Sequence, residues 1–244
     1  MNPSLLDFEW SVPPGVHVAF TTRIGGASTA PWDSFNLAAH VGDDPAHVEA
    51  NRVRLTELLA LPDSPFWLEQ VHGTDVLSPA GQSGRCVGDA SITDTAGKVC
   101  VVMVADCLPV LFATRDGGRV GAAHAGWRGL AAGVLDRTVS ALAAPAHELK
   151  AWLGPAISRE HFEVGPEVRA AFLAADAGAA DCFEANSRGR WQADLTGLAR
   201  RRLAALGVTD VSGGEWCTFA DGERFFSHRR DGKGGRMAAL IWKS

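Results

Sequence analysis

The sequence predicts an α+β fold with mixed β-sheets, because strand-like and helix-like segments occur together without strict alternation. The 244 residues contain no fixed-period repeat, no low-complexity linker and no block of like charges, so we expect one domain over residues 1–244. The composition, 46% hydrophobic and 21% charged, is typical of soluble globular proteins. A chain of this length buries enough surface to fold without disulfides.

Charge and hydropathy exclude several classes of function. The net charge is −5 and the basic residues are scattered, which argues against a nucleic-acid interface. No apolar run approaches the ~20 residues of a membrane span, and the first ten residues do not resemble a secretory signal, so we expect a cytoplasmic protein that does not bind membranes. Five cysteines without Cys-x-x-Cys spacing fit reduced thiols better than disulfides.

Residues 99–112 form the apolar, valine-rich run around which the rest of the chain is arranged. Its composition predicts a strand buried on both faces. Asp106 and Cys107 lie within the run and Pro109 follows them, so we expect the strand to bend or end there, since proline cannot donate to a sheet ladder. A carboxylate and a thiol are therefore expected where a buried strand breaks.

A second apolar segment, residues 120–125, precedes a glycine-bracketed turn and contains His124. Residues 115–118 carry turn-forming chemistry between the two segments. We therefore expect a hairpin that brings Cys107 close to His124.

The remaining segments are assigned from periodicity and from capping residues. We expect strands at residues 16–22, 66–72 and 152–157, a loop at 88–94, and a terminal hairpin formed by 225–230 and 237–242. Helices are expected after Asp44-Pro45, along Leu130, Val134, Thr138 and Leu142, after Gly165-Pro166, and after Asp194 up to Gly207.

Three side chains at the ends of strand-like segments form a candidate metal site: His72, Cys107 and His124. Two imidazoles and one thiolate suit zinc, and three protein ligands leave the fourth position open, as in catalytic zinc sites. Asp106 or Asp89 is expected to orient a ligand or carry a proton. The alternatives are a metal-free cysteine nucleophile with a histidine base, and an inert buried cysteine.

Two arginines that precede the central strand are candidates for binding an anion or another ligand. Arg23 opens a glycine-containing loop, which is either a plain turn or a set of N–H groups for an anion. Arg52 lies on the apolar stripe of the helix marked by Val48 and Leu55, so it either extends its head to solvent or anchors a ligand in a pocket.

Short blocks along nearly the whole chain resemble the YfiH/YlmD family, also described as the laccase-domain or polyphenol-oxidase family and as purine nucleoside phosphorylase-like. The matching blocks are 21–23, 25–26, 28, 36–37, 40–43, 51–52, 70–73, 89–90, 105–110, 123–129, 153–157, 162–164, 194–195, 217–218, 226–227 and 229–230.

The resemblance implies a layered YfiH-type sandwich with flanking helices and a zinc bound by His72, Cys107 and His124. It implies phosphorolysis of adenosine, inosine and methylthioadenosine together with adenosine deamination, or, as described for some members, a peptidoglycan editing activity that removes wrongly attached serine from a muramyl precursor. The expected partners are a nucleoside and phosphate, bound to a monomer or homodimer. The residues expected at the substrate are Arg23, Asn36, Arg52, Arg128 and Arg229, with Asp106 beside the three metal ligands in catalysis.

The polyphenol-oxidase description is tested by counting ligands. A multicopper oxidase needs about ten histidine ligands, whereas this chain has eight histidines and no His-x-His pair. We therefore expect no multicopper mechanism, although a single copper is an alternative occupant of the zinc site.

Overall fold

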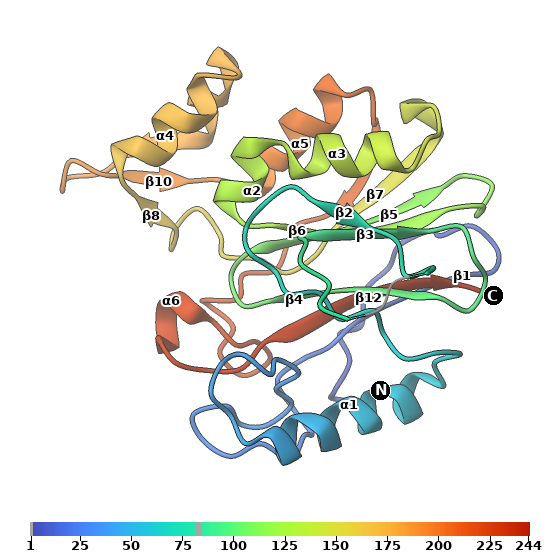
Figure 1. Cartoon of the computed structure of the whole chain (residues 1–244). Helices are drawn as coiled ribbons and strands as arrows, with labels where there is room; N and C mark the ends of the chain where they lie inside the picture. The colour runs from blue at the N-terminus through green and yellow to red at the C-terminus, as the bar shows by residue number, and fades with distance from the viewer. Residues whose placement is uncertain (1, 82–83) are drawn as a thin grey trace.

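The protein is a layered α+β sandwich in a computed structural model that describes residues 2–81 and 84–244. Figure 1 shows helix α1 (Pro45–Leu59) under a three-stranded sheet, a six-stranded sheet above it, and helices α2 (Trp127–Ala132), α3 (Val134–Ala141) and α5 (Leu195–Ala205) on top. This confirms the predicted fold class. The remaining helices are α4 (Pro166–Leu173), α6 (His228–Asp231) and the 3₁₀ turns Ala146–Glu148 and Ala177–Cys182.

Two sheets form the main layers of the sandwich, one of three strands and one of six. The three-stranded sheet has the order β1 (Val16–Phe20), β12 (Met237–Lys243), β4 (Val99–Val104). The six-stranded sheet has the order β11 (Asp210–Gly213), β7 (Leu149–Leu153), β5 (Leu108–Thr114), β6 (Val120–Ala125), β3 (Ala90–Thr93), β2 (Val76–Leu77). A small sheet contains β8 (Glu163–Val164), β10 (Trp191–Ala193) and β9 (Phe183–Ala185). The six-stranded sheet is mixed, because β11 with β7 and β2 with β3 are parallel and its other pairs are antiparallel.

The valine-rich run is a strand that changes sheets. It breaks at Ala105–Cys107, where Asp106 has a φ of 88°, so that β4 belongs to one sheet and β5 to the other. Every residue of β4 and β5 is buried, which confirms the prediction of burial on both faces. Pro109 is the second residue of β5, so the strand breaks before the proline and not at it.

Period-two alternation places the strand residues in three cores. The core between α1 and the three-stranded sheet contains Val99 and Val101, and the core between the two sheets contains Cys100 and Val102. The core under the upper helices contains Phe112 and its neighbours on β5 and β6. Because these strands face apolar layers on both sides, the run reads as continuously hydrophobic.

The predicted hairpin between β5 and β6 is confirmed, with Pro109 opposite His124 and Leu108 opposite Ala125. The predicted capping of two helices is also confirmed. Asp44 accepts a hydrogen bond from the backbone of Ala46 at the start of α1, and Asp194 accepts one from Gly197 at the start of α5.

Four segments differ from the sequence expectation. Residues 88–94 contain strand β3, and 66–72 form irregular chain with single bridges at Phe66 and Glu69. The helix expected over 130–142 is divided by Gly133, whose φ of 98° belongs to the left-handed region and ends α2. The prediction of a terminal hairpin is wrong. Strand β12 pairs with β1 and β4, and the segment expected to pair with it contains Ser227, which caps α6.

No helix in the described part of the chain combines the length and the apolar character that crossing a bilayer requires.

We expect Asp44→Ala to lower the free energy of unfolding by about 1 kcal/mol, because it removes the carboxylate oxygen that accepts from the backbone of Ala46 in the first turn of α1. In a chain of this length the melting temperature should fall by roughly 2–4 °C. Asp44→Asn keeps an acceptor and should retain most of the stability. An equal loss in both variants in calorimetry would contradict the capping argument.

Candidate metal centre

Three side chains from distant parts of the chain meet at one end of the gap between the two large sheets. The ligand atoms of His72, Cys107 and His124 all lie within 4.8 Å of one another, and Cys107 Sγ is 3.7 Å from His72 Nε2. The break between β4 and β5 presents Cys107, and the hairpin register places His124 of β6 beside it. The predicted trio is therefore brought together.

Residue His72 reaches the site on a loop that is fixed at two points. The side-chain amide of Gln70 makes two hydrogen bonds to the backbone of Met103, donating to its oxygen at 2.8 Å and accepting from its nitrogen at 2.7 Å. This attaches the loop to the free edge of β4. The second attachment is the carboxylate of Asp89, which accepts from the backbone of His72 at 2.9 Å and of Gly73 at 2.6 Å.

The same carboxylate of Asp89 also orients His124. Asp89 is fully buried, and its Oδ1 accepts a hydrogen bond from His124 Nδ1 at 2.8 Å. A carboxylate accepts only, so the Nδ1 proton is fixed there and His124 Nε2 is left for a metal. Of the two aspartates considered from the sequence, Asp89 is the one that contacts a ligand.

Two glycines allow the start of α2 to lie against the ligands. A methyl group at Gly126 would come within 2.7 Å of His72 Cδ2 and 3.0 Å of Cys107 Sγ. A methyl group at Gly129 would lie 2.8 Å from the backbone oxygen of Gly73. Because real Cβ atoms do not approach so closely, both positions require glycine for close packing.

Electrostatics favour an ionised thiol at the centre. Burial opposes ionisation of Cys107, but the charge and hydrogen bonds of His124 and His72 outweigh it and lower the pKa of the thiol to about 6. Burial also opposes charge on His124, yet the Cys107 thiolate and Asp89 raise its pKa to about 9. By contrast, burial raises the pKa of Cys100 to about 12. Thiolate is the form of cysteine that binds metals and reacts as a nucleophile.

The residues present fit a single metal ion. Two imidazoles and one thiolate converge, their orienting partner is in place, and this borderline-soft donor set suits zinc. Copper prefers imidazole and thiolate as well, and binds with higher intrinsic affinity than zinc.

Two cavities meet at Cys107. The larger, about 310 Å³, has a polar and basic wall formed by His40, Gln70, His72, Met103, Val104, Ala105, Cys107, His124, Arg128, His228 and Arg236. The smaller, about 120 Å³, is mainly apolar and is lined by Ala105, Asp106, Cys107, Trp127, Ile157, Phe162, Leu195, His228 and Arg229. The thiol of Cys107 therefore lies between a basic compartment and an apolar one.

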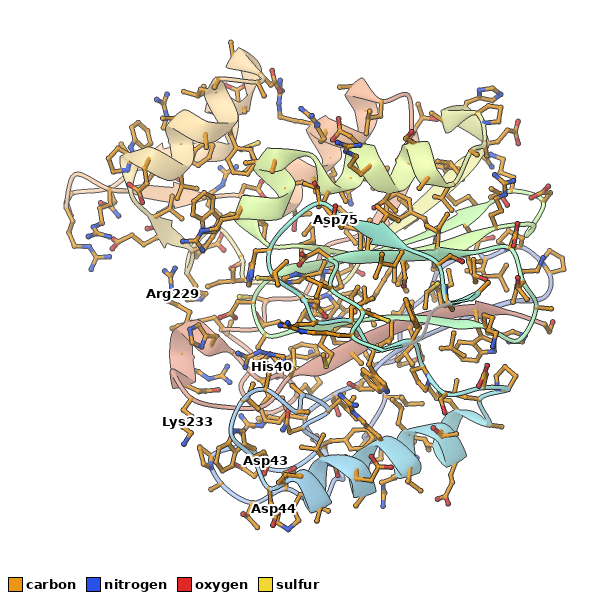
Figure 2. The ribbon with its side chains drawn as sticks, viewed as in Figure 1. His40, Asp43, Asp44, Asp75, Arg229 and Lys233 are labelled. Atoms are coloured by element: carbon orange, nitrogen blue, oxygen red, sulfur yellow. The ribbon has the colours of Figure 1, made fainter. Side chains whose placement is uncertain are left out.

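Three of the other predicted site residues border these cavities. Arg128 lines the larger cavity and lies over the Trp127 ring at 4.5 Å. Arg229 of α6 lines the smaller one, and Figure 2 shows it pointing toward β8, where it donates to the backbone oxygen of Glu163. Asp106 also lines the smaller cavity, but its two carboxylate oxygens accept from Thr218 Oγ1 and the backbone of Arg229. Its catalytic role stays a prediction.

The other three predicted site residues lie outside the lining of both cavities: Arg23, Arg52 and Asn36. Arg23 donates to the backbone of Asp33 and Gly222 and stacks over Phe226. Arg52 donates twice to the Leu37 carbonyl and stacks 4.0 Å over the Trp67 ring. The proposed contact of these arginines with substrate also stays a prediction.

The predicted substrate residue Asn36 is fully buried and organises backbone near the site. Its Oδ1 accepts from the backbone of Ala38 and Arg236, and its Nδ2 donates to Asp43. Because Arg236 immediately precedes β12, the hydrogen bond to Asn36 positions its backbone at the entrance to that strand.

Sequence reasoning missed four residues of the larger cavity: His40, Gln70, His228 and Arg236. Gln70 and His40 lie in blocks that carry the family resemblance, which was a usable signal. His228 and Arg236 lie in a segment interpreted as a hairpin, and that interpretation hid their position beside the site.

We expect the thiolate of Cys107 to control alkylation of chelator-treated protein. The rate of modification by iodoacetamide should rise through about pH 6 and level off above it, because the pKa of this thiol is about 6. Added zinc should block the reaction, and Cys100, fully buried, should stay unmodified. Peptide mass spectrometry measures both sites. A midpoint near pH 9 for Cys107 would contradict the proposed electrostatics.

We expect Asp89→Asn to weaken zinc binding roughly 10- to 100-fold, because the amide loses the charge that orients His124. Competition with a chromophoric chelator measures the affinity. Asp75→Asn is the matched control, since the side chain of Asp75 is exposed and Figure 2 shows this residue just before β2. Equal affinities in the two variants would show that Asp89 does not support the ligands.

Comparisons with known proteins agree over nearly the whole chain. The family described as multi-copper polyphenol oxidoreductase laccase matches residues 17–244. The chain is 54% identical over 237 residues to the purine nucleoside phosphorylase YfiH of Escherichia coli, covering 96% of each chain, and 54% identical over 235 residues to a purine nucleoside phosphorylase of Pseudomonas aeruginosa, again covering 96% of each.

Solved structures show the same fold. A Neisseria meningitidis protein superposes with a TM-score of 0.95 at 47% identity, covering 99% of each chain. YlmD from Geobacillus stearothermophilus superposes with a TM-score of 0.85 at 32% identity, covering 94% of this chain and 92% of that one. The chain therefore belongs to the laccase-like family that contains YfiH and YlmD.

Proposed function

We propose that this protein is a zinc-dependent purine nucleoside phosphorylase acting on adenosine, inosine and methylthioadenosine. The observation that carries the proposal is the convergence of His72, Cys107 and His124 at the junction of the two cavities. It is supported by relatives at 54% identity that are named purine nucleoside phosphorylases and match 96% of the chain.

Phosphorolysis requires three things of a site. A phosphate oxygen forms a bond to the anomeric carbon of the ribose while the bond from that carbon to the base nitrogen breaks. The electron pair of the broken bond goes to the base, which takes up a proton. The site must therefore hold a flat, largely apolar base on one side, an anion on the other, and the sugar between them.

The smaller cavity has the character that a purine base requires. Its walls include the aromatic rings of Trp127 and Phe162 and the side chain of Ile157. Apolar and aromatic walls are typical of sites for planar ligands, and a few polar groups fix orientation. His228 and Arg229 are the polar groups that this cavity offers to ring nitrogens and exocyclic atoms.

The ligand trio supplies the metal position between the cavities. Zinc bound there acts as a Lewis acid and lowers the pKa of a coordinated water or hydroxyl group. Cys107 contributes the negative charge, and Asp89 holds the ring of His124 at a fixed orientation through Nδ1. All three ligand residues line the larger cavity, so a molecule bound in that cavity would reach a metal held by the trio.

Adenosine deamination is the second activity that we propose for the same centre. In that reaction the oxygen of a water molecule replaces the amino group on the purine ring and ammonia leaves. A three-ligand zinc site with a free position suits this hydrolysis. The editing amidase and the metal-free cysteine hydrolase are the rival activities of this trio.

We expect the purified protein to release hypoxanthine from inosine and phosphate, and adenine or inosine from adenosine. Chromatography of the products measures this, with the zinc content determined in parallel. Cys107→Ala should lose both the metal and the turnover, because it removes the one thiolate ligand. Cys86→Ala is the matched control, since Cys86 lies outside both cavity walls.

Three outcomes would contradict the proposal. Release of serine from a nucleotide-linked muramyl substrate, with no purine released in excess phosphate, would favour the editing amidase. Full activity in metal-free protein would favour the cysteine nucleophile. Purine release that persists in Cys107→Ala would come from a contaminating enzyme.

A further inference from the structure

We propose that the larger cavity is an anion site in which Arg236, with His40 and Arg128 around it, binds inorganic phosphate. The proposal rests on the phosphorolysis proposed above and goes further, because it assigns the second substrate to named residues.

Positive charge outweighs negative charge around the larger cavity, where the Cys107 thiolate is the one anionic group among the described residues of the wall. Its wall carries two arginines, Arg128 and Arg236, and four histidines, and no carboxylate belongs to it among the described residues. The whole chain has a net charge of −5, so this local excess of positive charge runs against the overall balance. A concave surface with charge of one sign concentrates ions of the opposite sign.

No carboxylate in the described part of the chain forms an ion pair with either arginine of this wall, whereas Arg23, Arg159, Arg201 and Arg202 are each paired with an aspartate. Asp106 lines the smaller cavity, and Thr218 and the backbone of Arg229 already occupy its carboxylate oxygens. Arg236 and Arg128 are therefore cations without a paired carboxylate in the described part of the chain, and the negative charges of Cys107 and Asp106 offset only part of the burial cost of Arg236.

The guanidinium of Arg236 is held in place with donors to spare. Its backbone nitrogen donates to Asn36 Oδ1, and its Nη1 donates to the carbonyls of Gly234 and Gly235 at 3.1 and 2.9 Å. Its Nε and Nη2 groups have no acceptor among the described residues. Burial lowers the pKa of Arg236, so a bound anion would offset an existing cost of desolvation. A fixed, partly buried guanidinium is well suited to phosphate oxygens.

The position of the cavity fits the geometry of the reaction. The larger cavity shares Ala105, Cys107 and His228 with the apolar cavity assigned to the base. Phosphate at Arg236 and a base between Trp127 and Phe162 would therefore lie on opposite sides of Cys107, with the sugar between them. A phosphate oxygen then approaches the anomeric carbon from the side away from the departing base.

The test replaces the cation while keeping a polar side chain. Arg236→Gln should raise the KM for phosphate roughly 10- to 100-fold and leave the KM for inosine nearly unchanged, because charge-assisted hydrogen bonds to the anion are lost. Arg236→Lys should recover part of the loss. Arg137→Gln is the matched control, since Arg137 is exposed on α3 and lies outside both cavity walls.

A direct binding measurement separates this proposal from the proposed function. Calorimetric titration with inorganic phosphate, on protein of known metal content, should show binding that Arg236→Gln weakens and Arg137→Gln retains. The exposed residues His40 and Arg128 provide further variants, His40→Gln and Arg128→Gln, that should weaken phosphate binding without affecting folding. Binding that depends on Arg236 in a protein without phosphorolysis would uphold the anion site and reject the activity.

Two results would overturn the anion site. The first is an unchanged KM and an unchanged dissociation constant for phosphate in all three of Arg236→Gln, His40→Gln and Arg128→Gln. The second is phosphate binding that disappears in Cys107→Ala and persists in Arg236→Gln, which would place the anion on the metal alone.

Discussion

The buried carboxylate of Asp89 is the interaction on which the site depends. It accepts hydrogen bonds from the backbone of Val71, His72 and Gly73 and from the ring of His124, so it joins the loop that carries one ligand to the strand that carries another. A buried carboxylate is stable only when its lone pairs are matched, and here four donors match them. The hydrogen bonds, led by the one from His124, outweigh the burial that would raise the pKa of Asp89 and hold it below its usual value.

The change of sheet between β4 and β5 supplies the third ligand. A strand that passes from one sheet to the other must leave the ladder for a few residues, and Asp106 makes that turn with a positive φ. The turn leaves Cys107 half-buried in the wall of the larger cavity, beside His124. The thiol would otherwise be buried as Cys100 is, where burial raises its pKa to about 12. The topology therefore accounts for the different chemistry of the two cysteines.

Structural features that depend on local sequence patterns could be predicted from the sequence. Features that depend on pairing between distant strands could not. The valine-rich run, the β5–β6 hairpin and the caps Asp44 and Asp194 are local signals, and the structure confirms them. The partner of β12 was not predictable in this way, because its apolar residues suit any neighbour and its actual partners, β1 and β4, are distant in the chain. That error concealed Arg236, which immediately precedes β12 and lines the larger cavity. Asp89 was considered as a partner of the ligands, but only the register of β3 with β6 shows that it reaches His124.

The number of histidines in this chain is too small for the multicopper chemistry that the family's description implies. A blue copper centre with a three-copper cluster requires about ten imidazoles, and this chain has eight histidines in total. Within residues 2–81 and 84–244, His72, Cys107 and His124 are the one group whose ligand atoms could hold a metal. Of the other histidines, His40 and His228 line the larger cavity, whereas His17 stacks on Trp242 and His161 stacks on Phe219. One ion with one thiolate can polarise a bond or activate water, whereas four-electron reduction of oxygen needs several coupled metals. The chemistry that this site supports is therefore polar group transfer or hydrolysis, which is the class to which phosphorolysis belongs.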